Sequence, residues 1–183
     1  MNGSPAVFFD RDGTLMEDAH YCGDPAKVKV YTGVPQALVR LKEAGFAIVV
    51  VSNQSGIGRG LMTEAQYHAV QAEFLRQLEP ARIDASYFCP DAPGPPSACR
   101  KPAPGMVLAA AADLHLDPAQ SWMVGDKSAD IECGQRAGAR SILVLTGYGA
   151  EQNCRPDFIA ADAVEAVAMI LASPRQVPAR SIP

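Results

Sequence analysis

The chain has 183 residues, 48% of them hydrophobic, which is enough apolar material for one domain with a sizeable core. Its formal net charge of −4 and pI near 5.3 argue against a nucleic-acid partner, because such proteins usually present a basic face. We find neither an apolar run of the roughly 18–20 residues that span a membrane nor a basic signal peptide, so we expect a cytoplasmic protein with no membrane partner. We also expect a monomer.

Strands and helices are predicted to alternate along the chain. The run Ala6–Phe9 is uniformly apolar, and residues 34–42 repeat their apolar positions at helical steps until Gly45 ends the pattern. Phe46–Val51 is a β-branched run typical of a strand buried on both faces. Thr63 and Gln66 form a capping box that begins a helix.

The later elements continue the alternation. We expect strands at residues 85–88, 121–124, 141–145 and 158–160, and helices at 63–78, 106–114, 129–137 and 163–171. This order predicts an α/β fold of three layers, with a central parallel sheet flanked by helices in the Rossmann-like manner. Residues 1–172 are expected to form a single domain, and residues 173–183 a loose tail.

Four polar clusters follow predicted strands or lie in the proline-rich loop at 90–104. They are Asp10-Arg11-Asp12-Gly13, Ser52-Asn53-Gln54-Ser55, Arg100-Lys101 and Asp126-Lys127 with Asp130. Because ligands of open α/β sheets bind beyond the carboxyl ends of the strands, we expect these clusters to meet there. Each cluster alone also fits an ordinary turn or a solvated surface pair.

Taken together, the clusters predict a phosphoryl-transfer site. Asp10 and Asp126 are the expected Mg²⁺ ligands, since this cation prefers carboxylate oxygens and water. Attack of the Asp10 carboxylate on phosphorus gives an aspartyl-phosphate, with Lys101 offsetting the repulsion between the two negative groups. Asp12 is placed to protonate the leaving oxygen. Asp130 either caps the following helix or, as we prefer, supports the metal ligands.

These motifs resemble those of the haloacid dehalogenase phosphatase superfamily, over residues 7–146. Within it, the chain is similar to the heptose bisphosphate phosphatases and their histidinol phosphatase relatives. The resemblance implies a fold without a large cap domain, Asp10 as nucleophile, Asp12 as general acid/base and donor of a backbone carbonyl to Mg²⁺, and Asp126 as a further ligand. It implies that Ser52 and Lys101 bind the phosphoryl group.

The same resemblance implies a set of substrate contacts. These are Asp18, Tyr21, Asn53, Gln54, Ser55, Arg100 and Lys127. To them we add Arg59, on a glycine-rich loop at 56–60 that we expect to be mobile and that lacks the spacing of a dinucleotide fingerprint.

The cysteines depart from the pattern of the family. Five scattered cysteines fit reduced thiols better than a disulfide scaffold. Family members often bind zinc through Cys-x-His and Cys-x-Cys, but here those positions hold Cys89, Asp91, Ser97 and Cys99. Because structural zinc needs four Cys or His ligands, we predict that zinc is absent and that the prolines of this degenerate loop stiffen it instead.

The resemblance implies a function, which is Mg²⁺-dependent removal of the 7-phosphate of D-glycero-D-manno-heptose 1,7-bisphosphate, in carbohydrate metabolism that supplies lipopolysaccharide biosynthesis. The expected partner is a small phosphorylated sugar. Histidinol phosphate is the alternative substrate, since the same catalytic set serves both. A non-catalytic binding module is the alternative from another class, and it is disfavoured because Asp10, Asp12, Lys101 and Asp126 are all present.

Overall fold

One parallel sheet organises the chain. The structure, a computed structural model, describes residues 3–94 and 96–174; most of the expected tail, 175–183, lies outside the described residues. The sheet has six strands in the order β3-β2-β1-β4-β5-β6, all parallel. The strands are β1 (Ala6–Phe9), β2 (Ala47–Asn53), β3 (Ala85–Cys89), β4 (Trp122–Gly125), β5 (Arg140–Val144) and β6 (Phe158–Ala160).

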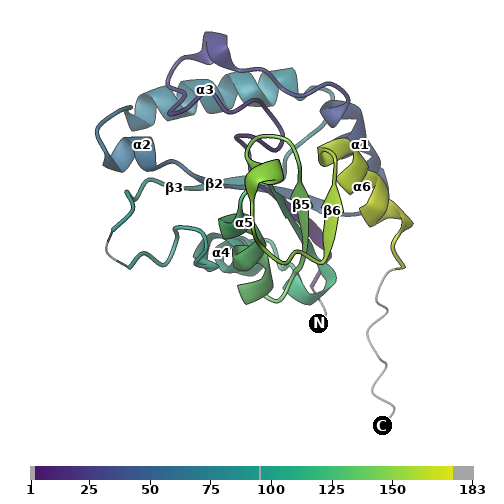
Figure 1. The fold of residues 1–183 in the computed structure, drawn as a ribbon. Helices are drawn as coiled ribbons and strands as arrows, with labels where there is room; N and C mark the ends of the chain where they lie inside the picture. The colour runs from purple at the N-terminus through teal and green to yellow at the C-terminus, as the bar shows by residue number, and fades with distance from the viewer. Residues whose placement is uncertain (1–2, 95, 175–183) are drawn as a thin grey trace.

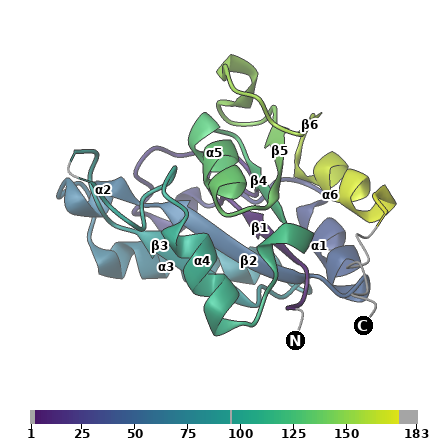
Figure 2. The same cartoon turned by 90° about the horizontal axis from the view of Figure 1, so that it is seen from below.

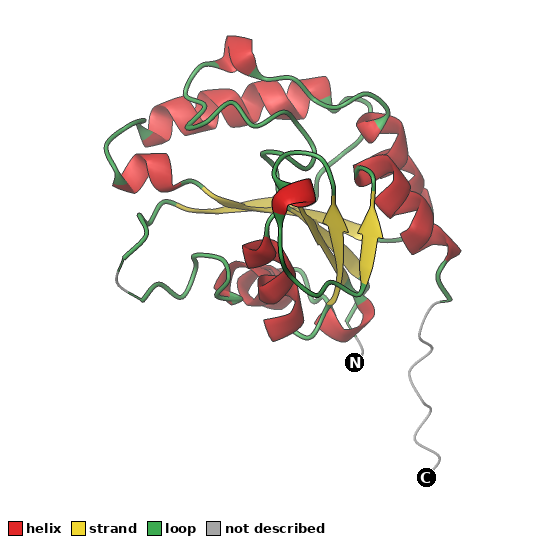
Figure 3. Ribbon diagram, in the orientation of Figure 1, coloured by secondary structure: helices red, strands yellow, loops and turns green. Residues whose placement is uncertain are grey.

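Helices cover both faces of this sheet (Figures 1 and 2). One layer consists of α1 (Val34–Glu43), α3 (Glu64–Gln77) and α6 (Ala163–Ala172), and the other of α4 (Gly105–Asp113) and α5 (Ser128–Arg136). Figure 3 shows the strands as the middle layer. The α/β class and the flanked parallel sheet are thus confirmed, and the described residues contain no large cap domain.

The central strands β1 and β4 are apolar and fully buried because each face of the sheet packs on a helical layer. In β1, Val7 and Phe9 belong to the core under α1, α3 and α6, whereas Ala6 and Phe8 belong to the core over α4 and α5. All of these side chains are fully buried. The alternation of faces along a strand therefore fills two cores from one short run.

The differences from the prediction lie at element ends and in loops. Strand β2 continues to Asn53, because Ser52 and Asn53 pair with the end of β3. Four short helical turns were not predicted: α2 (Ser55–Gly58) and the 3-10 turns Pro25–Lys27, Pro118–Gln120 and Gly149–Glu151. The Thr63–Gln66 capping box is confirmed. Among the described helices, none combines the length and the apolar character needed to cross a membrane.

The strand order reverses between β1 and β4. The chain runs outward from β1 through β2 to β3 and then returns to β4 on the other side of β1. The connections beyond these two strands diverge, which opens a crevice at their carboxyl ends. Asp10 follows β1 and Asp126 follows β4, so the topology brings the two carboxylates to this crevice.

Candidate active site

A cavity of about 370 Å³ lies at this crevice. Most of the predicted site residues line it: Asp10, Asp12, Asp18, Tyr21, Ser52, Asn53, Gln54, Ser55, Arg100, Lys101, Lys127 and Asp130. The other lining residues are His20, Cys22, Ala129 and Tyr148. Segments far apart in the sequence therefore converge on one cavity, as the strand-end positions of the motifs predict.

Lys101 lies at the centre of the polar network. Its ammonium donates to Asp10 Oδ1 at 2.7 Å and to the Val51 carbonyl at 2.7 Å, and it pairs with Asp130 Oδ1 at 2.6 Å. The side chain is almost completely buried. Three acceptors thus satisfy the three hydrogens of the ammonium, which compensates for the burial of its charge.

The charges of this group act on one another. Burial alone would lower the pKa of Lys101, but the carboxylates of Asp10 and Asp130 outweigh it and raise that pKa, so the ammonium stays charged. Burial raises the pKa of Asp10 to about 7, against the opposing effect of Lys101. The neighbouring carboxylates Asp130, Asp126 and Asp12 raise it further. The site therefore concentrates more negative charge than one lysine balances.

Asp126 has an oxygen available for a cation. Its side chain is fully buried, Oδ2 accepts from the Tyr148 N–H at 2.9 Å, and Oδ1 has no hydrogen-bond partner. A Cβ on Gly13, whose φ is +86°, would collide with this carboxylate. Oxygens of Asp10, Asp126 and Asp130 lie within 4.8 Å of one another. Since an orphaned buried oxygen is costly, these residues fit Mg²⁺.

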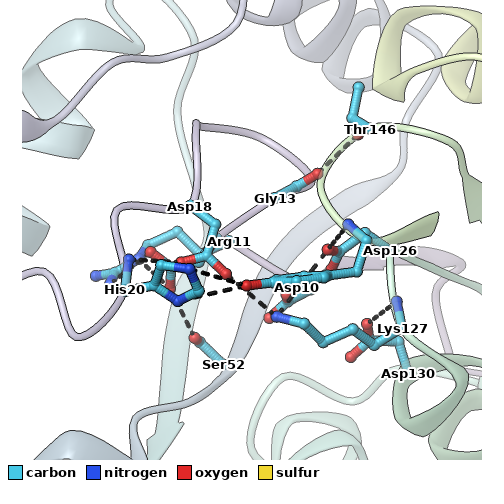
Figure 4. A network of polar contacts seen from close by, with 12 residues as sticks. Asp10, Arg11, Gly13, Asp18, His20, Ser52, Asp126, Lys127, Asp130 and Thr146 are labelled. Atoms are coloured by element: carbon cyan, nitrogen blue, oxygen red, sulfur yellow. Dashed lines mark hydrogen bonds and ion pairs between the residues drawn. The ribbon is translucent and has the colours of Figure 1, made fainter. Parts of the chain in front are cut away.

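Asp130 has more contacts than the prediction gave it. One oxygen pairs with Lys101, and Oδ2 accepts from the Lys127 N–H at 3.0 Å, which caps the start of α5. The carboxylate also belongs to the cluster with Asp10 and Asp126 (Figure 4). One side chain can therefore both cap the helix and support the expected metal ligands, which the sequence analysis treated as alternatives.

Asp12 is held by donors on both of its oxygens. The Arg11 guanidinium donates from Nε to Oδ2 and from Nη2 to Oδ1, both at 3.1 Å. Gln54 Nε2 donates to Oδ2 at 2.8 Å and also lies 2.6 Å from Ser52 Oγ. Gln54 also lines the cavity, and its predicted contact with substrate stays a prediction.

The amide of Asn53 joins two segments of the site. Asn53 Nδ2 donates to the Lys101 carbonyl, and the Lys101 N–H donates to Asn53 Oδ1, each at 3.0 Å. This reciprocal pair fixes the backbone of Lys101 against the end of β2. The predicted substrate contact of Asn53 stays a prediction, because its side-chain amide already serves the backbone.

Four side chains form the rim of the cavity. Lys127 Nζ lies 3.4 Å from Asp18 Oδ2 and 4.7 Å from the centre of the Tyr148 ring. The Tyr148 hydroxyl lies 3.1 Å from His20 Nε2. This rim therefore joins the loop after β1 to the loop after β5. Tyr148 was not predicted, although its position just after a strand was a usable signal.

Arg59 is the one predicted substrate contact outside the cavity lining. It is exposed on the turn after α2, with its guanidinium carbon 6.0 Å from the centre of the Tyr21 ring. The glycine-rich segment was expected to be a mobile loop, but α2 occupies its first half. Arg59 is the residue at which that helix ends.

The expectation of five reduced thiols is wrong for Cys89 and Cys99, which form a disulfide. The proline-rich loop folds back to the end of β3, so their Cα atoms lie 5.5 Å apart, within the usual range for a disulfide. Cys22, Cys133 and Cys154 are free. Sulfur and carboxylate atoms of Cys89, Asp91 and Cys99 lie within 4.8 Å of one another. The absence of zinc stays a prediction, which metal analysis of the purified protein tests.

Comparisons with known proteins identify relatives over most of the chain. The family model described as HAD-hydrolase-like matches residues 98–166. The D-glycero-D-manno-heptose-1,7-bisphosphate 7-phosphatase of Thermosynechococcus vestitus is 39% identical over 186 residues, covering 91% of this chain and 95% of that protein. The D-glycero-beta-D-manno-heptose-1,7-bisphosphate 7-phosphatase of Escherichia coli K12 is 41% identical over 153 residues, covering 78% and 80%.

Solved structures give the same result. The D,D-heptose 1,7-bisphosphate phosphatase from B. bronchiseptica, solved with magnesium and phosphate, matches with a TM-score of 0.85 and 31% identity. That match covers 91% of this chain and 98% of the solved one. The corresponding protein from Burkholderia thailandensis matches with a TM-score of 0.70 and 31% identity, over 92% and 99%. The chain therefore belongs to the HAD phosphatases, in the family of the D-glycero-D-manno-heptose 1,7-bisphosphate 7-phosphatases.

Proposed function

We propose that this phosphatase removes the 7-phosphate of D-glycero-D-manno-heptose 1,7-bisphosphate in a Mg²⁺-dependent reaction through an aspartyl-phosphate. The observation that carries the proposal is the buried group of Asp10, Lys101 and Asp126 at the point where the strand order reverses. The relatives named for this substrate support its identity.

The proposed reaction has two steps. In the first, a carboxylate oxygen of Asp10 attacks phosphorus, the ester P–O bond breaks, and the leaving sugar oxygen takes a proton from Asp12. In the second, a water oxygen attacks the phosphorus of the aspartyl-phosphate and gives its proton to Asp12, which releases phosphate and restores Asp10. Lys101 and Ser52 hold the oxygens of the transferred group.

Carboxylate oxygens of Asp10 and Asp126 and the Asp12 backbone carbonyl would hold Mg²⁺, with Asp130 beside them. The bound cation would neutralise charge on the phosphoryl oxygens. The unpaired Oδ1 of Asp126 supports this assignment, because it lies with no hydrogen bond in a fully buried side chain.

A substrate with two phosphates needs a second anion site. Arg100 and Lys127 line the cavity, and both are partly exposed, in contrast to the buried Lys101. Arg59 is left out of this role, because it does not line the cavity. We propose that Arg100 and Lys127 bind the phosphate that is not cleaved.

Kinetics with substrates that differ in this phosphate test the proposal. Replacing Arg100 by Gln, or Lys127 by Gln, should lower kcat/KM for the bisphosphate by about 10-fold to 100-fold. The same variants should change kcat/KM for heptose 7-phosphate by less than about threefold, because it lacks the second anion. Equal losses on both substrates would contradict the proposed anion site.

Histidinol phosphate is the alternative substrate. Its ammonium would meet Arg100 and Lys127, which repel it, although Asp18 beside Lys127 offers one carboxylate. Wild-type kcat/KM higher for histidinol phosphate than for the bisphosphate would favour this alternative.

Binding of Mg²⁺ is expected to weaken as the pH falls. Burial raises the pKa of Asp10 to about 7 and that of Asp126 to about 6, so both carboxylates begin to take up protons near neutral pH. Protons compete with the cation for the same oxygens, so the Kd for Mg²⁺ should rise by about tenfold per pH unit for each proton displaced. Calorimetric titrations between about pH 8 and about pH 5 measure this change. A Kd that stays constant over this range would contradict the expected ligands.

We also propose that the protein acts as a cytoplasmic monomer on a small sugar phosphate, with residues 1–172 as its single domain. The proposal of no nucleic-acid partner rests on the net charge of −4. Sedimentation of the purified protein tests the oligomeric state.

A further inference from the structure

Arg11 is a fully buried cation beside the site, and the proposed reaction gives it no role. It lies between Asp10 and Asp12 in the sequence, and its side chain is 1% exposed. A buried guanidinium is costly unless every polar edge has a partner. The partners of Arg11 therefore show what this charge serves.

One edge of the guanidinium faces the Asp12 carboxylate. Nε and Nη2 donate to the two carboxylate oxygens at 3.1 Å each, which is the paired-fork arrangement. Gln54 Nε2 adds a donor to Oδ2 at 2.8 Å. These donors fix the plane of the carboxylate and leave lone-pair capacity on Oδ1, while the side chain lines the cavity and is 17% exposed.

The other edge of the guanidinium is tied to the fold. Nη1 donates to Gln71 Oε1 at 3.1 Å, and Gln71 Nε2 donates to Ser86 Oγ at 3.1 Å. The guanidinium carbon also lies 5.3 Å from the centre of the buried Tyr67 ring. Arg11 is therefore anchored to α3 and β3, and its hydrogen bonds to Asp12 link that carboxylate to these two elements.

We infer that Arg11 is a positioning residue that holds Asp12 in the orientation from which it gives a proton to the leaving oxygen. The inference rests on the proposed role of Asp12. Lysine keeps the charge but cannot present two parallel N–H groups to one carboxylate. Arg11→Lys therefore separates the orientation of Asp12 from the mere presence of a cation.

The test compares two leaving groups. A sugar alcohol needs a proton to leave, whereas p-nitrophenolate leaves without one, and kcat/KM reports the steps up to its departure. Arg11→Lys should lower kcat/KM by about 100-fold for the heptose phosphate and by less than about threefold for p-nitrophenyl phosphate. Gln71→Leu, which removes the anchor of Arg11, should also lower kcat/KM more for the heptose phosphate than for p-nitrophenyl phosphate. We call this difference between the two substrates the split, and it should be smaller in Gln71→Leu than in Arg11→Lys.

Two reference variants decide the outcome. Asp12→Asn gives the full split, and Arg76→Lys makes the same substitution in the exposed pair with Glu73, where no change is expected. A split in Asp12→Asn with equal losses or no loss on both substrates in Arg11→Lys and Gln71→Leu would overturn the inference alone. No split in Asp12→Asn would overturn the proposed role of Asp12 and the inference with it.

Discussion

Replacing Asp10 by asparagine should lower kcat/KM for the sugar phosphate by about 10⁴-fold or more, because an amide oxygen does not form the covalent intermediate. The fold should survive. Burial raises the pKa of Asp10 to about 7, so the neutral form is already well tolerated, and an amide oxygen still accepts from Lys101. The free energy of unfolding should change by about 1 kcal/mol at most. Phosphate release and urea unfolding measure the two effects.

A matched substitution controls for this change. Asp162→Asn makes the same replacement at the N-cap of α6, where asparagine caps as well as aspartate. Its activity should equal that of the wild type. If Asp10→Asn kept activity within tenfold of the wild type, Asp10 would not be the nucleophile.

Replacing Lys101 by methionine should both inactivate and destabilise the protein. The ammonium is the shared partner of Asp10 and Asp130, and all three side chains are buried. Its removal leaves two buried carboxylates without a counter-charge, which should cost about 3–5 kcal/mol of unfolding free energy. Urea unfolding measures this loss. Lys42→Met, which breaks a half-exposed pair with Asp84, should cost no more than about 1 kcal/mol.

The destabilisation in Lys101→Met should depend on pH in a defined direction. Burial raises the pKa of Asp10 from its ordinary value of 3.8 to about 7 in the folded protein, so protonation of Asp10 favours folding. Stability is therefore lost as the pH rises from about 3.8 through about 7. Without Lys101 this effect should grow. The loss should therefore be larger above about pH 7 than near about pH 5. A loss that is equal at both pH values would contradict the buried charge cluster.

The meeting of the polar clusters was predictable because strand ends of a parallel sheet lie at one edge. Asp10, Ser52 and Asp126 each follow or end an apolar run, so strand order was not needed to bring them together. The apolar runs themselves were predictable because both sheet faces are buried. What the sequence alone settled was thus the sheet, its helices and the residues at its carboxyl edge.

The contacts among those residues were not predictable. Arg11 reaches Gln71, which is 60 positions further along the chain, and no local pattern marks that pairing. Lys101 lies in a loop whose path depends on the Asn53 amide. The disulfide formed by Cys89 and Cys99 depends on the same path. Such contacts follow from the packed loops, and sequence spacing does not fix them.

The most direct test of the proposed function follows both phosphates of the heptose 1,7-bisphosphate by ³¹P NMR, in the presence of Mg²⁺, with Asp10→Asn as the blank. Selective loss of the 7-phosphate signal, with an equal gain of inorganic phosphate and an intact anomeric phosphate, is the predicted result. Loss of the anomeric phosphate, or no phosphate release by the wild type, would contradict the proposal.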